Sequence, residues 1–286
     1  MIDPNIPCFN MQVFKSYRYV LCAGAALLLL PALLIGQQRD GGNLTPHQIE
    51  IEKQRVRLSS SDVEERRDAL TRLGSMRHHE ASRAAGSALK DPLPIIRATA
   101  ASSILSLPSE EAASQLIPLL NDKDEFVRRE AAYALGKTGS RSAVSALSEL
   151  LLTDKEDGVR GAAAVALGQI ADEAAVVPLS AVLNPQVAMP ASKSKKTKKP
   201  QTEPNLFVLR SAARSLGQIG SRAGSPSLIL VLQDEKAEDD LRRESAAALG
   251  RIGDSSALPS LRAALTARDP YLAEAAKEAI HRITLQ

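Results

Sequence analysis

One short phrase recurs along this chain at a nearly fixed interval. In its clearest copy Val127-Arg128 comes first, Ala131-Ala132 follows, and Leu135-Gly136 ends it. The last apolar residues of successive copies lie at positions 73, 104, 135, 167, 216, 249 and 280, so the intervals are 31, 31, 32, 49, 33 and 31 residues. Self-similarity with a period of about 20 to 50 residues is typical of solenoids, in which each repeat packs only on its neighbours. The chain is therefore predicted to stack repeats.

Each repeat contains a second apolar stretch ahead of the phrase. In one copy Leu147, Leu150 and Leu151 have the three- and four-residue spacing that places side chains on one face of a helix. No stretch alternates with a period of two for long, so no sheet is expected. The sequence predicts an all-α, right-handed α-solenoid (superhelix) of about seven helix pairs over residues 45–286, each pair consisting of helix A, a turn and helix B.

Two glycines close three copies of the phrase. The second glycine follows the last apolar residue of helix B, where a left-handed C-cap favours glycine; examples are Gly139, Gly220 and Gly253. The first glycine and the alanines are small, so neighbouring B helices are expected to approach closely. A helix start is also visible in Thr45-Pro46-His47-Gln48, which has the residues of a capping box with proline at the first helical position.

An aspartate precedes an arginine by six residues in three successive repeats: Asp91 and Arg97, Asp122 and Arg128, Asp154 and Arg160. This pattern resembles the Asp/Arg ladder of HEAT repeats, and the short unit with Ala-x-Ala-Leu-Gly-x-Ile-Gly resembles the HEAT-like repeats of phycobilin lyases. The resemblance covers about residues 45–286 and implies that these arginines tie one turn to the next by charge-assisted hydrogen bonds. The pattern departs in the sixth repeat, where Asp234 lies eight residues before Arg242, and in the seventh, where Ala273 replaces the arginine.

The N-terminal region has the features of an export segment. An apolar run from Val20 to Ile35 follows Lys15 and Arg18. We predict a signal peptide or a signal anchor at residues 1–36, followed by a polar spacer at 37–44. Pro31 interrupts the apolar run, which favours a cleaved signal, whereas the poor cleavage motif favours an anchor, so both alternatives stay open. The flanking positive charges place the rest of the chain outside the cytoplasm, in the periplasm or cell envelope.

Composition excludes some chemistry from the repeat domain. Both cysteines, Cys8 and Cys22, lie in the N-terminal segment, so the repeats have no disulfide and no thiolate ligand or nucleophile. The net charge is +3, of which residues 1–36 contribute +1 and residues 184–205 contribute +4, which leaves −2 for the remainder. A nearly neutral body is unlike a dedicated nucleic-acid binder, so nucleic acid is not an expected partner.

The interval of 49 residues marks an insertion at 184–205, between helices A and B of the fifth repeat. It contains four prolines and five lysines: Lys193, Lys195, Lys196, Lys198 and Lys199. Its composition predicts a disordered loop. One interpretation is a solvated loop without a role, and the other is a polybasic tether for anionic lipid, an envelope polymer or acidic proteins.

A single cluster, His78-His79-Glu80, has the residue types of a metal site. A His-Glu pair resembles deoxyhypusine hydroxylase, a HEAT-like di-iron enzyme, but that family uses several such pairs and this chain has one. We expect solvated residues at the start of a helix here. No Ser lies in a nucleophile-elbow sequence either, so no metal, cofactor or catalytic residue is predicted.

Helical phase supplies the remaining candidates. If Val127, Ala131 and Leu135 face the core, then Glu130, Tyr133 and Lys137 point away from it. The equivalent positions in other repeats are Ala162, Val165 and Gln169; Ser211, Arg214 and Gln218; Glu244, Ala247 and Arg251; and Ala275, Glu278 and Arg282. In HEAT-like proteins the B helices line the concave side, which makes this strip a candidate groove. We predict partner contacts at Tyr133, Lys137, Arg214, Gln218 and Arg251; the alternative is an ordinary solvated face.

These features together predict an exported or membrane-anchored, non-enzymatic scaffold that holds a protein or peptide partner. Two alternatives stay open. The first is an enzyme or chaperone subunit similar to the bilin lyases, which would need a cavity for a tetrapyrrole. The second is an envelope-binding module that acts through the polybasic loop, whose binding would weaken steeply with salt.

Overall fold

The computed structural model describes residues 44–184 and 205–285. Contacts divide the chain into residues 1–44 and residues 45–286. The export segment predicted at 1–36, nearly all of the spacer and all five lysines of the basic insertion lie outside the described residues. Within those described, no helix combines the length and apolar character needed to cross a membrane.

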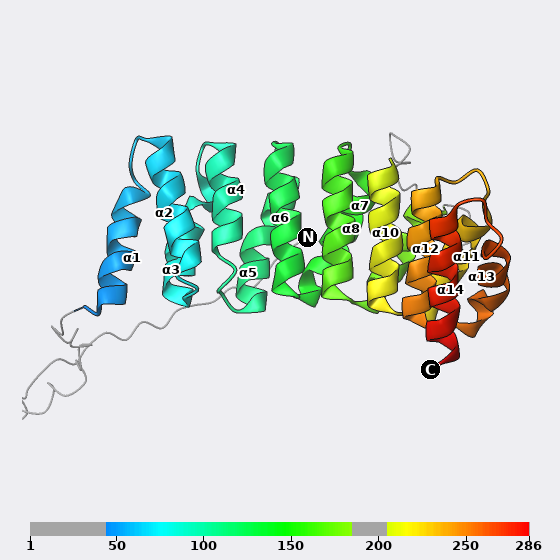
Figure 1. The fold of residues 1–286 in the computed structure, drawn as a ribbon. Coiled ribbons are helices and arrows are strands. Elements are labelled where there is room, and N and C mark those ends of the chain that lie inside the picture. Colours follow the sequence, from blue (N-terminus) through cyan, green and yellow to red (C-terminus); the bar gives the residue numbers. More distant parts are fainter. Residues whose placement is uncertain (1–43, 185–204, 286) are drawn as a thin grey trace, which may run out of the picture. The chain divides into compact units, whose positions relative to one another are not determined.

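Residues 45–184 and 205–285 form seven helix pairs, as predicted, and these described residues contain no strand. The A helices are α1 (Pro46–Arg57), α3 (His79–Gly86), α5 (Ser109–Leu116), α7 (Val144–Thr153), α9 (Val176–Leu183), α11 (Ser225–Gln233) and α13 (Leu258–Ala264). The B helices are α2 (Val63–Ser75), α4 (Pro94–Ser103), α6 (Glu125–Thr138), α8 (Asp157–Ile170), α10 (Leu206–Ile219), α12 (Asp239–Ile252) and α14 (Pro270–Thr284). Each B helix packs on the B helix of the next repeat, so they lie side by side in sequence order (Figure 1).

Local sequence determines where the helices begin and end. Thr45 caps α1 through a complete capping box with Gln48. Gly139, Gly220 and Gly253 end α6, α10 and α12 in the left-handed conformation, with φ of 67°, 74° and 73°, as predicted. The α8 helix ends in the same way without a glycine, because Ala171 adopts φ of 55° at that position.

Alanine and glycine allow the B helices to pack at short range. A Cβ atom on Gly136, Gly217 or Gly250 would lie 2.7 to 2.8 Å from the Cα of an alanine on the next B helix. Real carbon atoms keep about 3.5 to 4.0 Å apart, so only glycine fits. Leucine, isoleucine and valine side chains of both helix layers fill the space behind this contact and form one continuous core.

Arginines of the B helices pair with aspartates of the following repeat. Arg97 makes two hydrogen bonds of 2.7 Å with the carboxylate of Asp122 and donates to the backbone oxygen of Asp91 at 2.8 Å. Arg128 binds Asp154 in the same way, at 2.7 and 3.0 Å. The paired side chains are at most 10 % exposed. The ladder that the spacing predicted therefore joins the second, third and fourth repeats.

The inter-repeat arginine occupies different helix positions before and after the insertion. Arg160, only 1 % exposed, donates to Asp157 at 3.2 Å and to the backbone oxygen of Leu151 at 3.3 Å, both in its own repeat. Beyond the insertion, the arginine that reaches the next repeat occupies the following sequence position. Arg210 contacts Asp240 at 3.3 Å, and the next such residue, Arg243, contacts Asp269 at 2.5 Å.

Candidate functional site

The residues predicted to bind a partner lie on B helices that pack in succession: Tyr133 and Lys137 on α6, Arg214 and Gln218 on α10, and Arg251 on α12. The α8 helix lies between α6 and α10 and supplies Val165 and Gln169 at the equivalent positions. We call these residues together the B-helix strip.

Glycines of the B helices support the long polar side chains of the strip. A Cβ atom on Gly136 would collide with the side-chain amide of Gln169, and one on Gly168 would collide with the amide of Gln218. The guanidinium of Arg251 lies in the same relation to Gly217, with Nη1 only 2.9 Å from the point that a Cβ atom would occupy. Each of these side chains therefore rests on the glycine of the preceding repeat. The first glycine of the phrase thus makes room for a neighbour's polar side chain as well as for its helix.

Two arginines of the strip share one carboxylate. Arg214 donates from Nη2 to Glu244 at 2.7 Å, and Arg251 donates from Nη2 to the other oxygen of Glu244 at 2.8 Å. Arg251 also donates to the backbone oxygen of Arg214 at 3.2 Å, which links α12 to α10. Burial raises the pKa of Glu244, but the hydrogen bonds from both arginines outweigh it and hold the pKa below the usual range. This Arg–Glu–Arg cluster carries a net positive charge.

The apolar part of the strip is Tyr133 on α6 and Val165 on α8. Both are half-buried, and Tyr133 packs against the core. The prediction that Ala162 and Ser211 point to solvent is wrong, because both side chains are buried. Their small size lets adjacent B helices close over them, so the exposed strip is narrower on α8 and α10 than helical phase indicated.

An edge of the repeats that the sequence analysis did not single out also carries aromatic residues. Phe126, Phe207 and Tyr271 each occupy the second position of a B helix, on α6, α10 and α14. Tyr271 is 71 % exposed, and arginines lie over two of the rings, Arg129 over Phe126 and Arg243 over Tyr271. The signal was present in the sequence, since each aromatic residue directly precedes the apolar residue that opens the phrase.

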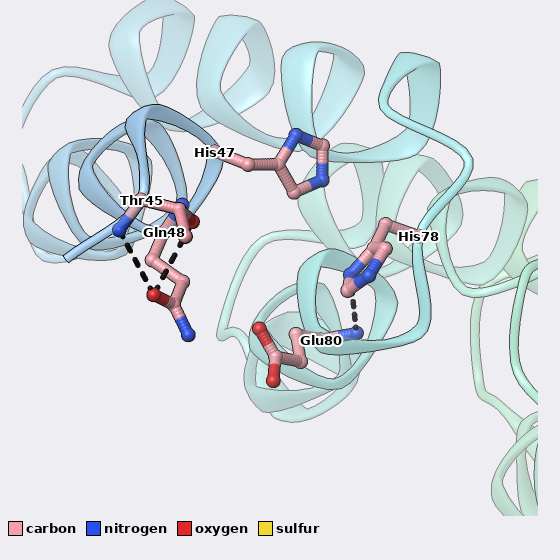
Figure 2. Close-up of a pocket in the computed structure, with 5 residues that line it drawn as sticks. All are labelled: Thr45, His47, Gln48, His78 and Glu80. Atoms are coloured by element: carbon pink, nitrogen blue, oxygen red, sulfur yellow. Dashed lines mark hydrogen bonds between the residues drawn. The ribbon is translucent and has the colours of Figure 1, made fainter.

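The His78-His79-Glu80 cluster lies beside a shallow cavity between α1 and the start of α3 (Figure 2). The ring of His47 meets that of His78 edge-on, with centroids 4.7 Å apart. His78 is the N-cap of α3, because its Nδ1 accepts a hydrogen bond from the backbone N–H of Glu80 at 3.3 Å. Among the described residues, no group of three or more His, Cys, Asp or Glu is arranged to hold a metal ion. The cluster begins a helix, as expected from the sequence.

Comparison with known proteins agrees with this architecture. The family model for HEAT repeats matches residues 52–136, 114–188 and 201–281. The described part of the chain is a stack of A and B helices that carries an Asp/Arg ladder, and the chain belongs to the HEAT-repeat family. None of the curated proteins matches this sequence.

Two solved structures show the same fold at low sequence identity, and a third is reported with them. The E. coli protein YibA is 20 % identical, with a TM-score of 0.56 over 86 % of this chain and 83 % of its own. An engineered protein is 21 % identical, with a TM-score of 0.50 over 82 % of this chain and 68 % of its own. The complex of CpcE and CpcF of phycocyanin lyase from Nostoc sp. PCC7120 is 23 % identical, with a TM-score of 0.48 over 89 % of this chain and 99 % of its own.

Proposed function

We propose that this protein is a non-enzymatic scaffold that holds a protein or peptide partner against its B-helix strip. The observation that carries the proposal is the placement of Gln169, Gln218 and Arg251 over glycines of the neighbouring repeats. Of these side chains Arg251 is also held by hydrogen bonds to Glu244 and to the backbone oxygen of Arg214, and a side chain held in this way loses less conformational entropy when a partner binds. Half-buried Tyr133 adds an aromatic contact of the kind that dominates many interfaces.

Site-specific photo-crosslinking in the native host tests this proposal. A photo-reactive amino acid is placed at position 169 on the strip, and, as a matched control, at Val177, which is 63 % exposed on helix α9. The expected result is an adduct to one defined protein from position 169 and none from position 177. A second chain that also carries Tyr133→Ala and Arg214→Ala should lose the adduct. Equal adducts from both positions, or an adduct that survives both substitutions, would contradict the proposal.

We further propose that the scaffold works outside the cytoplasm. The support is the apolar run Val20 to Ile35 behind Lys15 and Arg18. Fractionation with protease protection tests it: external protease should degrade the repeats once the outer barrier is opened, while a cytoplasmic marker survives. N-terminal sequencing of the mature protein then separates a cleaved signal, with a new terminus near residue 37, from an anchor that keeps the original terminus.

Two other functions make different predictions for the same material. Binding through the lysine run would disappear on deletion of residues 185–204 and in high salt, whereas strip binding should largely survive the deletion. A function like that of the bilin lyases would transfer a bilin to an acceptor protein on incubation, which a non-enzymatic scaffold would not do.

A further inference from the structure

The charged groups of the B-helix strip are unevenly neutralised. Lys137 is exposed and forms no ion pair with any residue that the structure describes. The side chain of Arg214 is 54 % exposed and uses Nη2 alone for Glu244, so its remaining N–H groups are left for another acceptor. Glu244 serves both Arg214 and Arg251, which leaves one positive charge on this cluster. Two cationic points thus remain for a ligand, one on α6 and one on α10.

Apolar surface lies between these two points. Tyr133 and Val165 occupy equivalent positions on the neighbouring helices α6 and α8, and both are half-buried. The small buried residues Ala162 and Ser211 leave no long side chain one turn before Val165 and Arg214, while Gln169 lies one turn after Val165, over Gly136. Along the strip the order is therefore cation, apolar contact, cation.

The spacing of the helices sets the length of a peptide segment that contacts Lys137, the apolar residues and Arg214. Packed helices lie about 8 to 10 Å apart, so α6 and α10, which are separated by α8, are about 16 to 20 Å apart. An extended chain advances about 3.3 Å per residue, so it covers that distance in about six residues. Side chains of an extended chain alternate between two faces, so the first, third and seventh residues point to the same side.

We propose, building on the function proposed above, that the strip binds an extended acidic segment of the partner. The segment carries carboxylates at its first and seventh residues and an apolar side chain at the third. The first carboxylate pairs with Lys137, the apolar side chain packs on Tyr133 and Val165, and the second carboxylate pairs with Arg214. The Arg–Glu–Arg cluster accepts the second carboxylate without losing Glu244, because Arg214 has N–H groups besides the one that binds Glu244.

A synthetic peptide tests the proposal with the full-length protein. The probe is a capped, fluorescein-labelled heptapeptide with glutamate at positions 1 and 7, leucine at 3 and threonine or serine elsewhere. Its dissociation constant is measured by fluorescence anisotropy in low and physiological salt. Lys137→Gln and Arg214→Gln should each weaken binding about three- to fivefold in low salt, as expected for exposed ion pairs. Circular dichroism verifies that each variant is folded.

Matched controls separate this interaction from general attraction. Arg262→Gln on α13 and Lys90→Gln remove equally exposed charges elsewhere and should leave the affinity unchanged. Moving the second glutamate of the peptide from position 7 to position 6 turns it to the opposite face and should weaken binding as much as Arg214→Gln does. Peptides with lysine in place of both glutamates should not bind.

The outcomes distinguish this inference from the proposed function. If the peptide does not bind at millimolar concentration, binds equally with glutamate at position 6, or is insensitive to Lys137→Gln and Arg214→Gln, the acidic extended segment is wrong. In that case a crosslink from position 169 to a defined protein would still uphold the scaffold function. If crosslinking also fails, both proposals fall.

Discussion

Two glycines of the B helices provide a test of the close packing, because one is crowded by the next helix and the other is not. A Cβ atom on Gly217 would lie 2.8 Å from the Cα of Ala248 and 2.9 Å from its Cβ. A Cβ atom on Gly158 would meet only the Cδ of Arg129, at 3.9 Å, which is an ordinary contact. Gly217→Ala and Gly158→Ala therefore make the same chemical change with and without a collision.

The expected free energies have opposite signs. Relief of the collision at Gly217 requires α10 and α12 to separate by about 0.7 to 1 Å, since carbon atoms keep about 3.5 to 4.0 Å apart. Overpacking of this kind costs about 1 to 3 kcal/mol, and the better helix propensity of alanine returns about 1 kcal/mol. Gly217→Ala should thus lower the free energy of unfolding by about 1 kcal/mol. Gly158→Ala keeps the gain in helix propensity without the collision and should raise the free energy of unfolding by about 0.5 kcal/mol.

Urea unfolding followed by circular dichroism measures both changes, and a thermal melt provides a second reading. For a domain of this size about 1 kcal/mol corresponds to about 2 to 4 °C in Tm, so the two variants should differ by at least about 3 °C. A Gly217→Ala protein as stable as the parent would refute the inferred close packing of α10 and α12. Equal losses in both variants would show that the loss at Gly217 does not come from a collision specific to that position.

Three further predictions concern charged groups and the strip. Arg97→Ala removes one partner of a nearly buried ion pair and should lower the free energy of unfolding, measured by chemical denaturation, by about 3 kcal/mol. Arg282→Ala removes one partner of an exposed ion pair with Glu278 and should lower it by less than about 1 kcal/mol. Similar losses in the two variants would contradict a structural role for the ladder. Burial raises the pKa of Asp122, but the hydrogen bonds from Arg97 outweigh it and lower the pKa. The ionised carboxylate of Asp122 therefore contributes fully to the stability of the fold above the usual aspartate pKa of about 4, and this contribution declines as pH falls through the lowered pKa. The free energy of unfolding should therefore decline below about pH 4, and Asp122→Asn should make that decline shallower; a steeper profile would reverse the inferred sign. Gly168→Ala should displace Gln218, and it should weaken partner crosslinking from position 169 more than Gly158→Ala does.

The repeat architecture could be predicted because its determinants are local and periodic. The six-residue spacing from an aspartate to Arg97 and to Arg128 predicted that both arginines belong to the ladder, and both do. Gly139 and Gly220 marked the ends of two helices, where the backbone takes the positive φ that glycine favours. Ala171 escaped prediction because a non-glycine residue rarely adopts the left-handed conformation that it takes there, with its N–H donating to the backbone oxygen of Leu167.

The contacts of the strip depended on distances that periodicity does not contain. Helical phase placed Glu244 at an outward position, but it could not show that Arg214 and Arg251 converge on its carboxylate from two helices. Phase also treated Ala162 as exposed, because it describes one helix and not the neighbour that covers it. The change of ladder position to Arg243 was missed for a similar reason, since only the contact with Asp269 across repeats reveals it.

Beyond the insertion at 184–205 the inter-repeat arginine lies one position later, but the packing under the B-helix strip is the same. Arg97 and Arg128 reach the next repeat from the fourth residue of their B helices, whereas Arg210 does so from the fifth residue of α10. Near the other end of α10, Gln218 still rests over Gly168 of α8, as Gln169 rests over the preceding repeat. The insertion between α9 and α10 and the shifted ion pair therefore leave the packing of α8 on α10 in place. A surface whose packing is kept past an insertion is one on which a partner spanning several repeats can depend.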